Sequence, residues 1–120
     1  ADHDDTMLDA AAFKFDEELD QARELLKNGY NIAAAVIAGV VLENSVKALC
    51  TRNSIPVGKF EAMNENLAKV GLQTPLQRKQ LTALYGARNA AAHGDVDAFK
   101  DVNVKNMIED IHRFVTNAMT

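Results

Sequence analysis

The sequence contains a single cysteine, Cys50, so no disulfide can form within the chain. Disulfides are typical of oxidising compartments, and their exclusion favours the reducing cytoplasm. The first ten residues, ADHDDTMLDA, are acidic and lack the basic start and apolar stretch of a signal peptide. A cytoplasmic location is therefore expected. Because the first residue is not methionine, we also expect either processing or a fragment of a longer protein.

Long apolar runs are scarce. The longest, IAAAVIAGVVL from Ile32 to Leu42, is much shorter than the roughly 20 residues that cross a bilayer. It predicts a buried helix and no membrane association. Only two prolines and six glycines occur, while 48% of the residues are hydrophobic and 25% are charged. This composition is typical of an ordered soluble protein, and 120 residues suffice for one domain, covering positions 1–120.

Positive charge is scarce at the start of the chain and concentrated in the middle. Residues 1–43 carry three basic and ten acidic side chains, whereas residues 44–94 carry seven basic and two acidic ones. The net charge of −4 argues against general affinity for nucleic acids, but the basic stretch can meet a phosphate backbone locally. Lysines on a solvated helix are the alternative explanation of this stretch.

Apolar residues recur at spacings of three and four, and no long segment alternates with a period of two, so helices are expected throughout. Gly29, the Ile55–Pro56 step, Gly71 and the Thr74–Pro75 start signal divide the pattern. The expected helices cover residues 6–28, 30–51, 60–70, 75–93 and 103–119. Four long helices and one short one predict an all-α, four-helix-type up-and-down bundle.

The first and last of these helices each have an expected inward face. These core residues are Leu8, Phe15, Leu19 and Leu26 in the first helix, and Val104, Ile108, Ile111, Val115 and Met119 in the last.

The stretch RNAAAHG, residues 88–94, interrupts the fourth helix with a cation, an amide and a titratable ring. With residues about 100° apart, Arg88 lies about 20° from Leu81, in the middle of the apolar stripe. A buried arginine requires an acidic partner, an internal network or a ligand. Asn89 and His93 lie one turn apart beside this stripe, and the helix dipole favours the protonated form of His93. The three alanines between them allow another backbone to approach, so the stretch is a candidate site.

Structural roles for these residues remain open as alternatives. A histidine at a helix end often only caps the helix, and Arg88 can extend its charged end to solvent or pair with a glutamate across the bundle. Glu43 either forms a helical ion pair with Lys47 or holds Arg88 or polarises His93 across the bundle. Small residues in the turns before Glu43 permit close packing of another helix: Ala34, Ala35, Ala38 and Gly39.

Other chemical motifs are weak. The stretch EDIH, from Glu109 to His112, has the spacing of a di-iron ligand pair, but it occurs once and has no matching carboxylates. No glycine-rich phosphate-binding loop is found. We therefore expect no metal and no cofactor.

The stretch ARNAAAHGD resembles the signature of the HEPN domains (higher eukaryotes and prokaryotes nucleotide-binding), which consists of an arginine, a polar residue, a few further positions and a histidine. The resemblance extends over nearly the whole chain, including AAAVIAGVVLENSVKAL, FEAMNENLAKVGL and VNVKNMIEDIHRFV in the same order. It implies a homodimer in which two motif helices meet and share one cleft. Carried over to this chain, Arg88 is the motif arginine, Asn89 the polar residue and His93 the motif histidine.

The resemblance also implies a function. Many HEPN domains are metal-independent endoribonucleases that leave a 2′,3′-cyclic phosphate, and many act as toxins or defence effectors, sometimes held by an antitoxin. RNA, a second copy and an antitoxin or fused domain are thus the expected partners. The alternative is a non-catalytic dimerisation or nucleic-acid-sensing module, because other members of the family keep the bundle chiefly for association.

Overall fold

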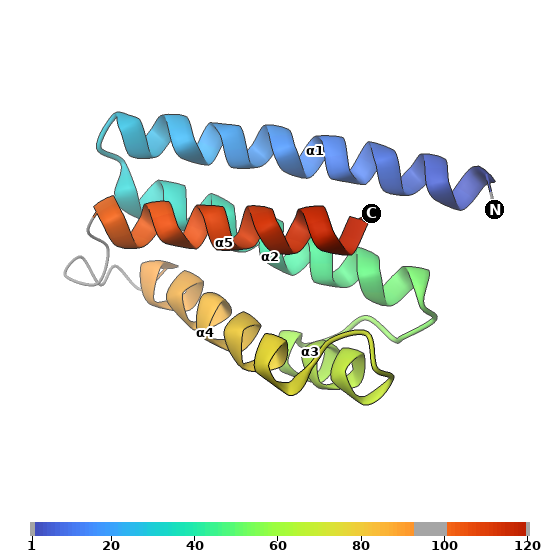
Figure 1. Cartoon of the computed structure of the whole chain (residues 1–120). Coiled ribbons are helices and arrows are strands. Elements are labelled where there is room, and N and C mark those ends of the chain that lie inside the picture. Colours follow the sequence, from blue (N-terminus) through green and yellow to red (C-terminus); the bar gives the residue numbers. More distant parts are fainter. Residues whose placement is uncertain (1, 93–100, 120) are drawn as a thin grey trace.

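The computed structural model describes the backbone of residues 2–92 and 101–119, and the side chains of residues 10–91 and 103–118. Every regular element in these ranges is a helix, which confirms the all-helical prediction (Figure 1). Each expected helix is present, and the predicted end of the fourth helix at His93 and Gly94 lies outside the described residues. The helices are α1 (Asp2–Lys27), α2 (Asn31–Arg52), α3 (Phe60–Lys69), α4 (Pro75–Ala92) and α5 (Asp101–Met119).

Local signals in the sequence set several helix ends. Gly29 and Gly71, predicted to end helices, have positive φ values of 86° and 80°, which side chains with a Cβ rarely adopt. At the start of α4, the backbone N–H of Gln77 donates to Thr74 Oγ1 at 3.1 Å, and the backbone N–H of Thr74 donates to Gln77 Oε1 at 2.8 Å. This reciprocal pair satisfies N–H groups that have no partner inside the helix.

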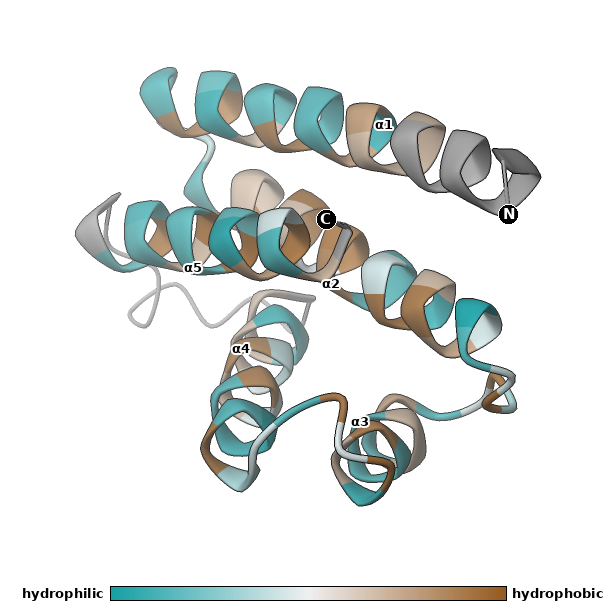
Figure 2. Cartoon of the chain, turned by 45° about the vertical axis from the view of Figure 1, so that its right-hand side comes forward, coloured by the Kyte–Doolittle hydropathy of each residue, from teal (hydrophilic) through white to brown (hydrophobic). Residues whose placement is uncertain are grey.

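Helix α2 is the centre of the fold, because α1, α3, α4 and α5 all contact it. Most of its apolar residues are buried in the core or pack against it, and Figure 2 shows α2 largely in the brown of hydrophobic residues. Leu26 is partly buried, and the side chains of Leu8 and Met119 lie outside the described residues. The remaining predicted core residues of α1 and α5 are buried: Phe15, Leu19, Val104, Ile108, Ile111 and Val115.

One side of the predicted four-helix bundle is open. Helix α5 packs against α1 and α2, whereas the main contacts of α4 within the described residues are with α2 and α3. Helix α4 is therefore inclined away from α5, as Figure 2 shows. This departure from a regular bundle leaves a groove between α4 and α5.

A buried amide holds α4 against α3. Asn64 is completely buried, and its Nδ2 donates to the carbonyl oxygen of Arg78 at 2.9 Å and to Thr82 Oγ1 at 3.1 Å. Gln73 in the connecting turn donates to the backbone and side-chain oxygens of Asn64. Nearby, the rings of Phe60 and Tyr85 stack with their centroids 4.1 Å apart. These contacts tilt α4 toward α3.

By length and composition alone, α2 is apolar enough to cross a membrane, since an 18-residue window has a mean hydropathy of 1.7. The uninterrupted apolar run from Ile32 to Leu42 is only part of this helix, which continues to Arg52. A helix in the core of a soluble protein can have the same length and composition as a membrane-spanning helix, and α2 contacts all four other helices.

Replacing Asn64 by alanine should lower the free energy of unfolding by about 2 kcal/mol, because it removes the hydrogen bonds that this completely buried amide makes with Arg78, Thr82 and Gln73. Urea unfolding followed by circular dichroism measures this change. The matched control is Asn66→Ala on the same helix, where the side chain is partly exposed and the expected change is below about 0.5 kcal/mol. Equal effects of the two substitutions would contradict the anchoring role of Asn64.

Candidate functional site

The arginine of the motif lies in a tight contact between α4 and α2. The aliphatic stem of Arg88 packs directly on Gly39, and an ideal Cβ built on Gly39 would lie 1.9 Å from Arg88 Cγ and 2.4 Å from Arg88 Cβ. Only a residue without a side chain fits at this position. The small residues expected to permit close packing are all buried on α2: Ala34, Ala35, Ala38 and Gly39.

The guanidinium of Arg88 is held by an amide and an aromatic ring. Arg88 Nη1 donates to Asn89 Oδ1 at 3.2 Å, and Arg88 Cζ lies 5.8 Å from the centroid of the Tyr85 ring. This distance is within the range of a cation–π interaction. Arg88 Nε is buried and has no hydrogen-bond partner among the described residues. The structure thus places Arg88 in the apolar stripe, as predicted, with an unused donor.

No described carboxylate neutralises Arg88. Glu43, the predicted candidate, instead pairs with Lys47 one turn later on α2, with Oε1 and Nζ 3.2 Å apart. The helical ion pair is therefore the arrangement that the structure shows for Glu43. Its other possible role, toward His93, concerns a residue outside the described part of the chain.

The described part of the site therefore contains two of the three motif residues. Asn89 is partly buried and in hydrogen-bond contact with Arg88, so these two predicted residues do lie together. His93 belongs to residues 93–100, which the structure does not describe. Its predicted position one turn after Asn89 stays a prediction.

Sequence reasoning missed the aromatic support of the site. Tyr85 lies three residues before Arg88, a spacing that places two side chains on the same helical face. That spacing was a usable signal for the contact between Arg88 and Tyr85. The stacking partner Phe60 comes from another helix, and no local pattern in the sequence predicts this pairing.

The residues of the EDIH stretch contact a cation from α1. Arg23 Nε donates to Glu109 Oε1 at 3.1 Å, and Arg23 Nη1 donates to Asp20 Oδ1 at 2.8 Å. Arg23 Nη2 lies 3.2 Å from His112 Nδ1. Burial lowers the pKa of the Arg23 guanidinium, but hydrogen bonds and opposite charges from Glu109 and Asp20 outweigh it and raise the pKa overall. In this structure, Glu109 and His112 join α1 to α5.

Cys50 is buried in the core and is not placed for nucleophilic chemistry. Burial raises the pKa of its thiol, so the reactive thiolate is disfavoured. Cys50 therefore packs as a small apolar residue of α2.

Comparisons of the chain with protein-family models, with curated proteins and with solved structures gave no match. The features of the chain that point to a function are the geometry around Arg88 and the resemblance of the motif.

Gly39→Ala should lower the free energy of unfolding by about 2 kcal/mol or more, because the new methyl group overlaps the Arg88 stem and forces α2 and α4 apart. The control is Gly86→Ala on the exposed side of α4, where an added Cβ meets nothing within 4 Å. That change should raise stability by about 0.5–1 kcal/mol through helix propensity. Thermal unfolding compares the two, and a harmless Gly39→Ala would contradict the close contact.

Proposed function

We propose that this protein is a HEPN-like homodimeric endoribonuclease that cleaves RNA without a metal, at a site built from Arg88, Asn89 and His93. The observation that supports the proposal is the set of contacts made by the Arg88 guanidinium. It is fixed by Asn89 and Tyr85, it has a buried N–H without a described partner, and no described carboxylate pairs with it. A positive charge positioned in this way suits the oxygens of a phosphodiester.

The proposed reaction is an internal displacement at phosphorus. The 2′-oxygen of the ribose bonds to phosphorus, the bond from phosphorus to the 5′-oxygen breaks, and a proton moves to the leaving oxygen. His93 from one copy removes the proton of the 2′-hydroxyl, and His93 from the other protonates the 5′-oxygen. Arg88 stabilises the charge of the phosphorane, and Asn89 orients the phosphate. The products carry a 2′,3′-cyclic phosphate and a 5′-hydroxyl.

Association of two copies is part of the proposal, because a single chain supplies one motif histidine. Apolar surface is present on α2 beside Gly39, where Val40 is 37% exposed and Val36 is partly buried. Two valines form only a small apolar surface, so the proposed association depends on the family resemblance. A toxin or defence role in the cytoplasm, with an antitoxin or fused domain as partner, is proposed by analogy with the family.

The test is incubation of the purified protein with single-stranded RNA in EDTA. Cleavage with 2′,3′-cyclic phosphate ends is expected, and both Arg88→Ala and His93→Ala should lower the rate at least about 100-fold. DNA of the same sequence should remain intact because it lacks the attacking hydroxyl. The control is Lys79→Ala, an exposed cation on α4 outside the motif, which should retain activity. Absence of cleavage by the wild-type dimer would refute the enzyme.

The second candidate is a non-catalytic association module. It is favoured by the packing of the Arg88 stem on Gly39, because this contact alone gives the arginine a structural role. Under this alternative, Arg88→Ala lowers the thermal unfolding temperature while leaving RNA unchanged in all samples. Because the enzyme uses the same packing contact, RNA cleavage by the wild type, and not the unfolding temperature, separates the two candidates.

A further inference from the structure

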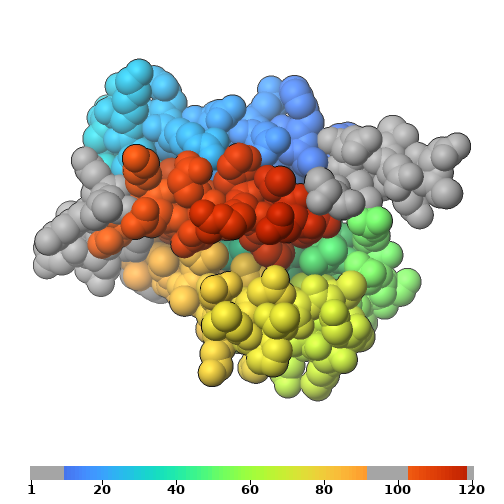
Figure 3. Space-filling model, viewed as in Figure 1, coloured from blue at the N-terminus to red at the C-terminus, as the bar shows by residue number. Residues whose placement is uncertain are grey.

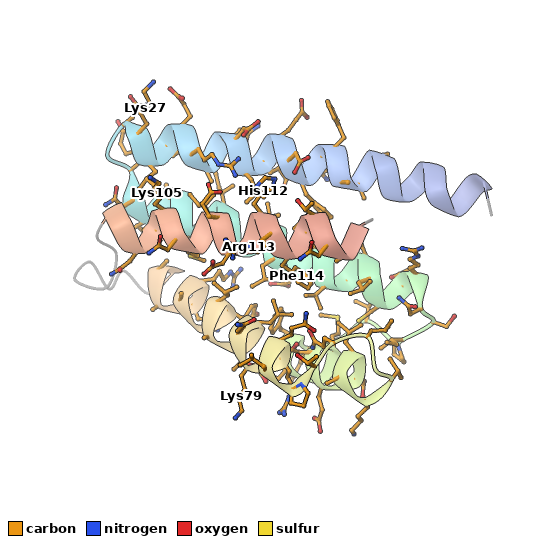
Figure 4. The ribbon with its side chains drawn as sticks, viewed as in Figure 1. Lys27, Lys79, Lys105, His112, Arg113 and Phe114 are labelled. Atoms are coloured by element: carbon orange, nitrogen blue, oxygen red, sulfur yellow. The ribbon has the colours of Figure 1, made fainter. Side chains whose placement is uncertain are left out.

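A large groove of about 960 Å³ lies between α4 and α5, on the side where the bundle is open. Helix α2 forms its base, and atoms of α2 are visible between α5 and α4 in Figure 3. Arg113 and Phe114 lie on the side of α5 that faces α4 (Figure 4). The apolar part of the lining includes Leu49, Leu81, Leu84, Met107 and Phe114.

Amides dominate the polar lining of the groove. The chain has fourteen asparagines and glutamines, and seven of them line this one groove. Gln80 on α4 and Asn106 on α5 come from opposite walls, are exposed, and make no hydrogen bond with other described residues. Each offers a donor and an acceptor to a ligand. The seven residues are Asn53, Gln73, Gln77, Gln80, Asn103, Asn106 and Asn117.

The charges around the groove favour an anionic ligand. Two guanidinium groups line it, from Arg52 and Arg113, against the single carboxylate of Asp110, which pairs with Arg113 at 3.1 Å. Arg52 makes no ion pair with the described residues. The residues of α4 that line the groove are uncharged, so the unpaired charge in the described lining is the guanidinium of Arg52. This positive charge can attract a phosphate locally, although the whole chain has a net charge of −4.

We infer that this groove binds single-stranded RNA and takes unpaired bases between α4 and α5. Unpaired bases present neutral donors and acceptors on their edges, which the amides of Gln80 and Asn106 match. Phe114 is partly buried and offers a ring on which a base can stack. Arg52 faces the phosphates. A duplex does not fit this description, because its base edges are already paired.

The groove is separate from the motif. Leu81, Leu84 and Ala87 of α4 line the groove, whereas the Arg88 stem packs on Gly39 of α2 and Arg88 is not part of the lining. The inference deepens the proposed ribonuclease and rests on it for the biological meaning of RNA binding. It assigns single-stranded RNA as the substrate form and base contacts as the source of sequence preference.

Fluorescence anisotropy with a labelled 2′-O-methyl oligonucleotide tests the inference, because that strand cannot be cleaved. The double variant Gln80→Ala/Asn106→Ala should bind at least tenfold more weakly than wild type. Both side chains are exposed, so the fold should be unaffected. The matched control is Gln21→Ala/Asn66→Ala, which removes two amides outside the groove and should bind like wild type. An abasic strand of equal charge should bind at least tenfold more weakly than the strand with bases.

Equal binding by the groove variant and wild type, or equal binding of abasic and base-bearing strands, would overturn the inference. If the wild type bound no oligonucleotide, the inference would also be overturned, and a protein partner would become the alternative ligand of the groove. The proposed function is judged separately, by cleavage of unmodified RNA. Base-dependent binding without cleavage would refute the ribonuclease and support RNA binding in the groove. Cleavage together with unchanged binding by the groove variant would support the ribonuclease and refute RNA binding in the groove.

Discussion

The contact between Arg88 and Gly39 is the constraint on which the rest of the structure depends. It brings the backbones of α2 and α4 together at a point where no side chain can intervene, and it fixes the position of the cation. Because the stem is used for packing, the guanidinium is restricted to the neighbourhood of Asn89 and Tyr85. A charge held this way loses little conformational entropy on binding an anion, which is the general advantage of a preorganised site.

The position of α4 also determines the shape of the molecule. Asn64 and the stacked rings of Phe60 and Tyr85 attach α4 to α3, while α5 is attached to α1 through the cluster around Arg23. Both helix pairs, α3 with α4 and α1 with α5, pack against α2, and the groove lies between the two pairs. Helix α4 therefore holds the motif arginine against α2 and also forms one wall of the amide-rich groove. Both features fit a protein that handles single-stranded nucleic acid, which is the function we propose.

The sequence predicts what depends on neighbouring residues and misses what depends on distant ones. Gly29, Gly71 and the Thr74 cap mark helix ends through local backbone chemistry, and the three- and four-residue spacing identifies the core faces of α1 and α5. The position of Arg88 in an apolar stripe follows from the same spacing. The stacking of Phe60 on Tyr85 and the opening between α4 and α5 join separate helices, so no local pattern contains them.

The central claim is that the Arg88 stem serves packing while its guanidinium serves catalysis. Arg88→Met separates these roles, because methionine keeps an unbranched apolar stem and removes the charge. Thermal unfolding and RNA cleavage should be measured side by side on this variant. The account predicts an unfolding temperature close to that of wild type together with loss of cleavage. Retained cleavage in a folded Arg88→Met protein would contradict it.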